Sequence, residues 1–276
     1  LPVLGGKLRV NGRGFWDYYH QHELDRIVAP VPGGVDTRYI RQDKHQTELG
    51  GRYARNFGDR IQLDLVGLRQ TENYGLTVDG FSAPNGVRFL LDKTTEETIG
   101  RAVVKYRQSA TLSFEAGAET ALNTLDSRTG LLQNGAPIPL PAANVEVEEK
   151  RNEAFAKAVW RPSPQWTVEG GLRYETSSIT SSGDLRLEKD LHFAKPRLFV
   201  AWAPVEGTQI RARYEREVGQ LNFDDFVASS SFTSGVVTSG NPDIDPEQAW
   251  VSELAVEQRF WTNGSVALTA RHSQLT

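Results

Sequence analysis

The sequence predicts an all-β protein whose antiparallel strands follow one another along the chain. Three observations carry this prediction. Apolar and polar residues alternate with a period of two, and aromatic residues are concentrated at the ends of these alternating runs. The links between successive runs are alternately short and long. A period of two is typical of strands, whereas a helix repeats every 3.6 residues. Helical periodicity is nearly missing from the chain.

The alternation is clear in residues 165–175. One face of this run carries Trp166, Leu172 and Tyr174, and the other carries Glu169 and Arg173. Comparable runs cover residues 7–18, 112–119, 208–215 and 248–260. We expect about eleven such strands in the 276 residues, roughly one per 25 residues. This spacing exceeds the ~8–12 residues that are usual in soluble β-sandwiches.

The links between the runs distinguish a membrane barrel from a soluble sandwich. Short links fall at residues 56–59, 107–110, 162–165, 204–207 and 262–264, and long ones at 24–36, 79–86, 126–144, 177–184 and 222–245. In an up-and-down sheet, alternate links lie on the same side. All short turns therefore fall on one rim and all long loops on the other, which is typical of transmembrane barrels. A Greek-key sandwich has no reason to show this asymmetry.

Aromatic residues mark both ends of the predicted strands, where a bilayer interface favours them. Near the short turns stand Trp160, Trp166, Trp202, Trp261, Phe57 and Tyr106, and towards the long loops stand Trp16, Tyr18, Tyr74, Tyr174 and Trp250. Residues 8–18 match the ~9–11 residues of a tilted transmembrane strand. The sequence therefore predicts an antiparallel up-and-down transmembrane β-barrel. In its last hairpin, Leu254, Val256 and Phe260 would face lipid, and Glu253, Ala255, Glu257 and Arg259 the lumen.

Composition excludes several classes of function. The formal net charge of −4 gives no basic field for nucleic acid. Without cysteine there is no disulfide, thiol nucleophile or thiolate metal site. No hydrolase, zinc-protease or phosphate-loop motif is present, so we expect neither enzyme activity nor a cofactor. The chain lacks methionine and begins at Leu1, and we expect it to be an excerpt from a longer protein.

One stretch resembles a known family. Residues 240–247, Gly-Asn-Pro-Asp-Ile-Asp-Pro-Glu, with Ser-Glu-Leu at 252–254 and Glu-Gln-Arg-Phe at 257–260, resemble a segment of TonB-dependent outer-membrane receptors. In that family the segment leads from a large outer loop into a barrel strand. Residues 195–204 and 208–217 resemble the strands before it. The chain departs from the family pattern at Val251-Ser252 and at Val218-Gly219, so the loop after Glu217 is expected to differ in shape.

The resemblance implies a 22-strand barrel closed by an N-terminal plug domain. Residues 1–276 would then be a partial barrel domain of about 11 strands, without the plug and the C-terminal strands. We expect these residues alone to form an open, curved sheet with at least one unpaired edge strand. The implied partners are outer-membrane lipid and lipopolysaccharide, a small-molecule ligand, and the TonB–ExbB–ExbD complex, reached through the missing N-terminal region.

The function implied by the resemblance is active import of a scarce ligand across the bacterial outer membrane. Iron–siderophore complexes are the commonest cargo of the family, and the sequence does not rank them against vitamin B12, haem or oligosaccharides. A passive or ligand-gated porin and a surface adhesin remain alternatives. An upstream plug favours the transporter, an inward constricting loop the porin, and a passenger domain or very large outer loops the adhesin.

Candidate ligand-binding residues lie at the root of the loop over residues 222–245: Phe223, Asp224, Asp225, Phe226, Asp243 and Asp245. Aromatic rings and carboxylates there could grip an iron chelate, although Asn-Pro-Asp and Asp-Pro also suit simple turns. His20 and His22 share a strand face and are weak metal candidates, with a polar strand extension as the alternative. Opposite charges on the lumenal face are expected to brace neighbouring strands. They are Arg101, Lys105, Arg107, Arg173, Arg211, Arg213 and Arg259 with Glu115, Glu119, Glu169, Glu215, Glu253 and Glu257.

Overall fold

The protein is one large antiparallel sheet, seen in a computed structural model. It describes residues 1–26, 35–82, 84–140, 143–184, 186–221, 229–231, 236–238, 244–261 and 264–276. The sheet contains β1 (Pro2–Val3), β2 (Gly6–Arg26), β3 (Val35–Phe57), β4 (Ile61–Ser82), β5 (Asn85–Arg107), β6 (Leu112–Gln133), β7 (Ala136–Ile138), β8 (Asn144–Ser163), β9 (Trp166–Gly183), β10 (Leu187–Trp202), β11 (Thr208–Val218), β14 (Gln248–Phe260) and β15 (Gly264–Leu275). A separate hairpin pairs β12 (Ser229–Ser231) with β13 (Val236–Thr238).

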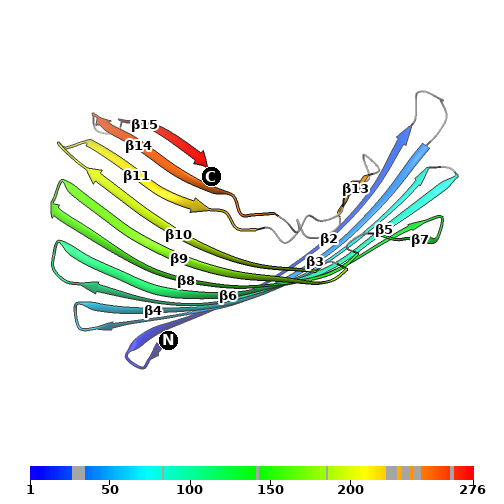
Figure 1. Ribbon diagram of the computed structural model, residues 1–276, viewed down its shortest axis with the longest axis horizontal. Helices are drawn as coiled ribbons and strands as arrows, with labels where there is room; N and C mark the ends of the chain where they lie inside the picture. Colours follow the sequence, from blue (N-terminus) through cyan, green and yellow to red (C-terminus); the bar gives the residue numbers. More distant parts are fainter. Residues whose placement is uncertain are drawn as a thin grey trace.

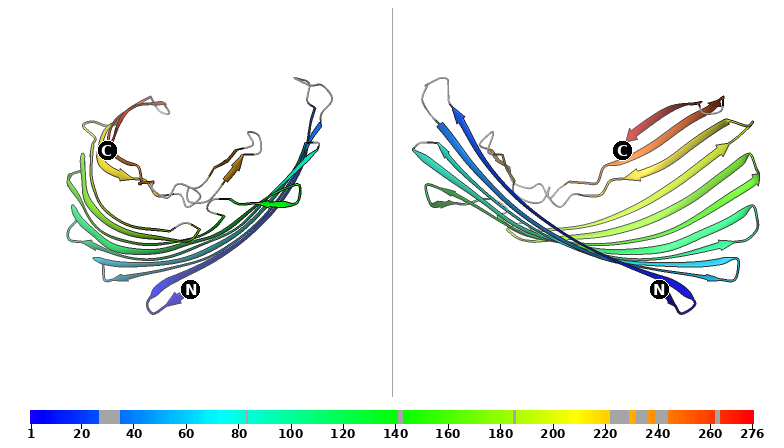
Figure 2. Two further views of the ribbon diagram at one scale, coloured as in Figure 1. Left: turned by 45° about the vertical axis from the view of Figure 1, so that its right-hand side comes forward. Right: turned by 180° about the vertical axis from the view of Figure 1, so that it is seen from behind.

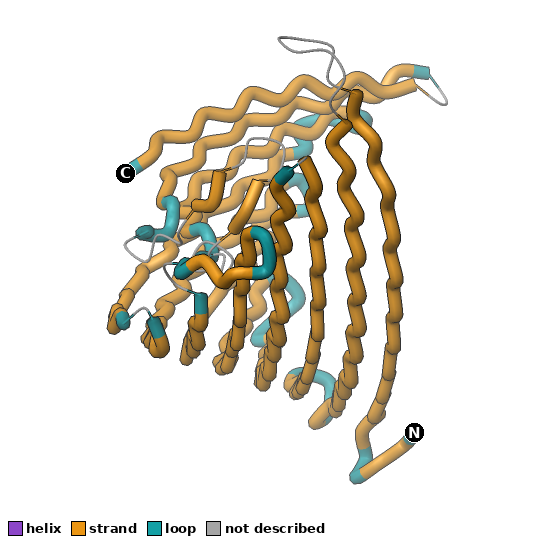
Figure 3. The backbone as a smooth tube through the Cα atoms, turned by 90° about the vertical axis from the view of Figure 1, so that its right-hand side faces the viewer, coloured by secondary structure: helices purple, strands orange, loops and turns teal. Residues whose placement is uncertain are grey.

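Chain order is also spatial order, so the up-and-down topology is confirmed. Eleven of the described strands are long, as predicted, and β1 and β7 are short additions to β2 and β6. The sheet curves into an open trough, and the β12–β13 hairpin lies on its concave side (Figures 1 and 2). Within the described residues, β2 and β15 do not pair with each other, and the gap between them is visible in Figure 3. The expected open sheet is therefore confirmed. The described residues contain no helix long and apolar enough to cross a bilayer.

The strands are longer than predicted, because much of what looked like long loops is paired strand. β4 and β5 stay in register up to Ser82 and Asn85, and β9 continues to Gly183. The prediction of long loops at residues 79–86 and 177–184 was therefore wrong. Backbone ladders need no apolar side chains, and a serine-rich stretch such as residues 177–182 pairs without showing alternation. The short turns are confirmed, with Gly58 and Gly207 at positive φ angles of 61° and 80°.

The convex face carries the apolar band that a membrane requires. Leu172, Leu198 and Leu254 are each about half exposed there. Stacked aromatic pairs lie towards either end of the band: Trp166 with Trp202 near the short turns, and Tyr214 with Trp250 on the other side. Their ring centroids are 5.3 and 5.1 Å apart. These positions are as expected for interfacial aromatic girdles. Tyr74, predicted to be among them, instead lies on the concave face and donates a hydrogen bond to Gln42.

The concave face carries a buried apolar cluster near the long-loop rim. Leu125, Val145, Val147 and Ile179 are fully buried there against partly buried leucines, one of which is Leu221 just after β11. Because Leu221 belongs to the segment that leaves β11, this segment folds back over the concave face instead of continuing away from the rim. The buried cluster therefore fixes the start of the connection to β14.

The orientation of the band makes a prediction for two adjacent residues of β15. Leu268 lies on the convex face and Thr269 on the concave face, paired with Val256 and Ala255 respectively. Leu268→Arg should destabilise the membrane-inserted protein by about 2–4 kcal/mol, since arginine at the mid-bilayer is costly, whereas Thr269→Arg should cost much less. Urea unfolding in lipid vesicles measures both. Equal losses for the two variants would contradict the assignment of faces.

Candidate functional site: the charged inner wall

The concave face between the short-turn rim and the apolar cluster is lined by ion pairs that cross from strand to strand. We call this surface the inner wall. Its pairs follow the sheet from β5 to β14: Arg101–Glu119, Lys105–Glu115, Arg151–Glu119, Lys157–Glu115, Arg173–Glu153, Lys195–Glu153, Lys195–Glu175, Arg197–Glu215, Arg213–Glu253 and Arg211–Glu257. Each of these pairs joins two strands, so the predicted bracing by opposite charges is confirmed for them. Arg259 does not brace a neighbouring strand among the described residues, because its carboxylate partner at 3.6 Å is Glu257 of its own strand, β14.

The tightest part of the inner wall is centred on Lys195 of β10. Its Nζ lies 3.0 Å from a carboxylate oxygen of Glu153 and 2.6 Å from one of Glu175. Arg173 adds a second contact to Glu153 at 2.8 Å. The side chains of Lys195, Glu153 and Glu175 are only 16%, 10% and 14% exposed, so this cluster is partly desolvated. It ties β8, β9 and β10 together at mid-wall.

An aromatic side chain supports the same region from within. Phe155 of β8 is 8% exposed and lies beneath two guanidinium groups, those of Arg101 and Arg173, at 5.4 and 5.0 Å from the ring centre. Cation–π contacts of this kind hold the planar groups over the ring. Both arginines are therefore fixed by a ring as well as by carboxylates.

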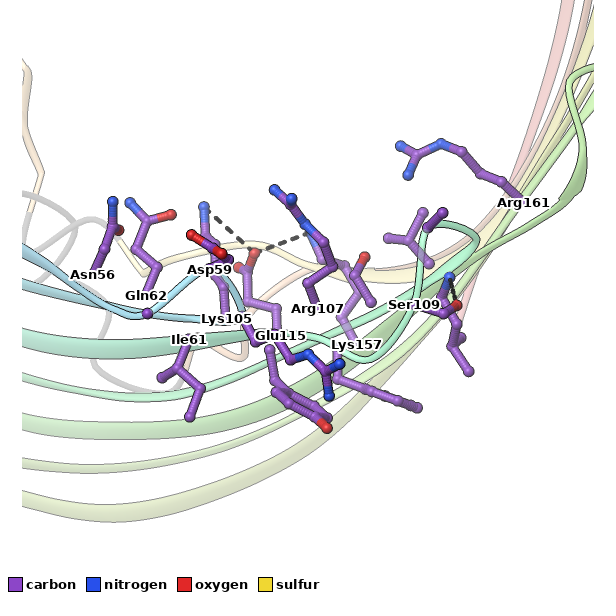
Figure 4. Close-up of a pocket in the computed structure, with 18 residues that line it drawn as sticks. Asn56, Asp59, Ile61, Gln62, Lys105, Arg107, Ser109, Glu115, Lys157 and Arg161 are labelled. Carbon is purple, nitrogen blue, oxygen red and sulfur yellow. Dashed lines mark hydrogen bonds and ion pairs between the residues drawn. The ribbon is translucent and has the colours of Figure 1, made fainter.

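At the short-turn rim the wall is looser and more basic. Glu115 lies between Lys105 and Lys157, at 3.7 and 3.6 Å (Figure 4). Arg107 and Arg161 border the same hollow of about 600 Å³. Neither arginine has an ion pair within the described part of the chain, so Arg107 does not extend the charge ladder as predicted. It is the last residue of β5, where no flanking strand residue provides a carboxylate.

Several wall residues were missed by the sequence analysis. Lys195, Arg197, Lys157, Glu153 and Glu175 all belong to the ion-pair network. The alternation in the sequence could have identified them. Each lies an even number of residues from a predicted lumenal residue of its own strand, or is paired in register with the lumenal face of a neighbouring strand.

The predicted loop-root site is only partly described. Phe223, Asp224, Asp225, Phe226 and Asp243 lie outside the described residues. Asp245 is described. Its carboxylate accepts an ion pair from Lys189 Nζ at 2.6 Å, and the same Nζ donates to the backbone oxygen of Ile244 at 2.9 Å. The Asp245 side chain remains 74% exposed, so one carboxylate at the loop root is held in place and still open to solvent.

The two histidines of β2 lie on the convex face beyond the aromatic band. His22 stacks on Tyr39 of β3 with ring centroids 4.2 Å apart and planes 7° from parallel. His20 pairs in register with Arg41. No group of three or more His, Asp or Glu side chains in the described ranges is arranged to hold a metal ion. Nearby, a hydrogen bond to Asp79 and the charge of that carboxylate raise the pKa of the Arg88 guanidinium above its usual value.

A strand-paired trough with an apolar convex band, aromatic girdles and a charged concave wall defines a segment of a transmembrane β-barrel. Residues 5–272 match the family described as "TonB dependent receptor-like, beta-barrel". The chain belongs to this family of transport receptors, which reside in the outer membrane of Gram-negative bacteria. The short turns thus form the periplasmic rim and the long-strand ends the outer rim.

Solved structures support the fold. The chain is similar to the siderophore receptor PiuA from Acinetobacter baumannii, with 11% identity over 96% of this chain and 50% of that one, and a TM-score of 0.61. The ferric preacinetobactin receptor BauA of the same species matches with 12% identity, 98% and 45% coverage and a TM-score of 0.59. The ferric yersiniabactin uptake receptor FyuA from Yersinia pestis matches with 12% identity over 98% of this chain and 45% of that one, and a TM-score of 0.55. The chain thus spans about half the length of these structures. Comparison with curated proteins finds no match.

The burial of the Lys195 cluster predicts a large difference between two lysines. Lys195→Met removes the cation from two carboxylates that stay mostly buried, and should destabilise the protein by about 3 kcal/mol. Lys150→Met removes an exposed ion pair to Glu148 on the convex side and should cost less than ~1 kcal/mol. Urea unfolding of the two variants in the same vesicles measures the difference. Comparable losses would show that the inner wall is as well hydrated as the outer surface.

Proposed function

We propose that residues 1–276 are part of the barrel of an active outer-membrane transporter that imports an iron–siderophore complex. The observation that carries this proposal is the family match over residues 5–272. The plug, and with it the contact to TonB and its ExbB–ExbD partners, would lie in the remainder of the protein. The length of the similar structures, about twice that of this chain, supports such a division.

The inner wall suits a transporter with an occupied lumen. Its charges are largely paired with each other, so it presents a hydrated but nearly neutralised surface against which another protein part or a passing ligand can move. Three of the similar structures are receptors whose names refer to siderophores or their ferric complexes, which favours an iron chelate as cargo. The outer rim, held among lipid and lipopolysaccharide, would capture it.

Uptake measurements test this proposal. Iron-starved cells carrying the full-length gene, and cells lacking it, are supplied with ⁵⁵Fe bound to catecholate, hydroxamate or carboxylate siderophores. We expect uptake of at least one chelate that needs both the gene and TonB. Gene-dependent uptake that continues without TonB would identify a passive porin instead. Absence of uptake of every chelate, with intact protein in the outer membrane, would reject an iron–siderophore as cargo.

The loop root provides a sharper prediction. We propose that Asp245, together with Phe223, Asp224, Asp225, Phe226 and Asp243, contacts the captured ligand. Asp245→Asn removes an exposed charge that Lys189 orients and should weaken ligand binding by about tenfold, the size of one charge-assisted hydrogen bond. Asp190→Asn, which changes the neighbour of Lys189 on the opposite strand face, is the matched control and should bind normally. Equilibrium binding of the chelate found by the uptake assay compares them.

A further inference from the structure

A single row of polar side chains crosses the concave face between the charged inner wall and the apolar cluster. Gln70 of β4, Glu97 of β5, Asn123 of β6 and Glu149 of β8 are register partners, each with the next. Register partners project to the same face of a sheet. The row therefore brings two carboxylates, one on either side of Asn123, to the same level of the lumen.

Glu149 is the buried carboxylate of this row, at 5% exposure. Its Oε2 accepts a hydrogen bond from Asn123 Nδ2 at 2.9 Å, and its Oε1 accepts one from Ser177 Oγ at 2.6 Å. Both donors are neutral. In the described part of the chain no lysine or arginine lies within ion-pair distance of Glu149, whereas the carboxylates of the inner wall have one or two cations each. Arg151, two residues along the same strand, pairs with Glu119.

Asn123 contributes an unused acceptor at the same place. The residue is 8% exposed, and its Nδ2 is committed to Glu149. Its Oδ1 is buried and has no hydrogen-bond partner. A buried acceptor without a donor costs about 1–3 kcal/mol. Such a cost is removed when a ligand brings a donor to the oxygen.

Both residues open into a hollow of about 300 Å³ on the concave face. Gln70, Glu97, Asn123 and Glu149 line it from the wall, and Gln220 and Leu221 line it from the segment after β11. Glu97 has no ion pair or hydrogen bond with any other described residue, so its carboxylate is available to a ligand. The hollow is therefore a lumenal pocket enclosed partly by the wall and partly by the returning chain.

Among the described residues, carboxylates outnumber cations around the hollow. Besides Glu97 and Glu149, its lining includes the carboxylate of Glu72, which is paired with Lys44 at 2.8 Å. Lys93 is the cation among the described lining residues, and its Nζ lies 5.6 Å from the centre of the Tyr74 ring. Two carboxylates thus remain without a described cationic partner.

We propose that this hollow binds a ligand group carrying a protonated nitrogen, a primary ammonium or a guanidinium. The available groups are two carboxylates and an amide oxygen, all acceptors, and charged N–H donors satisfy acceptors of this kind most strongly. An anion would meet like charge from Glu97 and Glu149. A metal ion is not favoured, because the described residues lack a group of three suitable ligands.

The spacing of the row matches a ligand with two such groups. Glu97 and Glu149 are two strands apart, so their backbones are separated by roughly 10 Å, and their side chains can converge from either side of Asn123. A diamine with a short aliphatic chain bridges such a separation. Agmatine, which has an ammonium at one end and a guanidinium at the other, is therefore a suitable probe.

Calorimetric titration of the purified full-length protein with agmatine at low ionic strength tests the site. We expect saturable binding that Glu149→Gln weakens by about tenfold or more and Glu97→Gln by about threefold or more, as lost charge-assisted contacts predict. Glu146→Gln is the matched control, since Glu146 lies on the same strand but on the convex face, and should leave binding unchanged. The neutral analogue 1,4-butanediol should not bind.

The variants are chosen so that misfolding does not imitate the result. Glu149→Gln keeps an oxygen for Ser177 or Asn123, and Glu97→Gln removes no described contact. Equal affinity of wild type and both variants, binding of butanediol as strong as that of agmatine, or no saturable binding in the wild type would each overturn the proposal. The last result would mean that a cation of the protein itself fills the hollow. Because the titration needs no TonB and no transport, its failure is distinguishable from failure of the import proposal.

Discussion

The structure depends on one constraint: a strand inside hydrocarbon has no water to pair its backbone, so each N–H and C=O must bond to a neighbouring strand. Over the described residues the pairing is continuous from β2 to β15, with one register shift, between β8 and β9 near Trp160 and Ser163. Once the ladder is unbroken, the parity of one residue fixes the face of every other. The apolar band, the girdles and the inner wall all follow from that one condition.

The same ladder explains how the concave face remains polar without destabilising the sheet. Register pairing puts Glu115 opposite Lys105 and Lys157, and Glu119 opposite Arg101. These charges therefore meet a counter-charge directly across the ladder. Glu153 has Glu119 and Glu175 as register partners, and it reaches the counter-charge of Arg173 diagonally. Where the wall is most buried, around Lys195, contacts shorten to 2.6–3.0 Å, whereas at the hydrated rim they lengthen to 3.6–3.7 Å.

Sequence alone could predict what parity controls. The strand number, the short turns, the lipid-facing Leu254 and the lumenal Glu253 follow from alternation and turn chemistry, and the structure agrees. The sequence could not predict how far the strands extend once the alternation of apolar and polar residues ends. Strands continue through serine and threonine because backbone pairing does not require apolar side chains, so β9 reaches Gly183 without any apolar period. Tyr74 was placed in the girdle by its chemistry alone, although its parity puts it inside.

Contacts between distant positions were also beyond the reach of the sequence. Asn123 and Glu149 are 26 residues apart, and their hydrogen bond exists only because β6 and β8 pair in one particular register. A shift of that register by one residue would turn every side chain of the strand to the other face. Alternation reveals which face a residue takes, but not which residue it meets across the ladder.

The order of side chains along β8 shows how the chemistry of the lumenal face changes from the periplasmic rim to the outer rim. From Lys157 towards the outer rim, its inward positions read Lys157, Phe155, Glu153, Arg151, Glu149, Val147 and Val145. Charges that are paired come first, then a carboxylate held only by neutral donors, then buried aliphatic residues. The acceptor row thus lies at the boundary where the wall changes from ionic to apolar. At such a boundary water is scarce enough for a charged hydrogen bond to gain strength. The proposed ligand suits this boundary, because its protonated nitrogen would meet the carboxylates and its carbon chain would meet the leucine and valine side chains above.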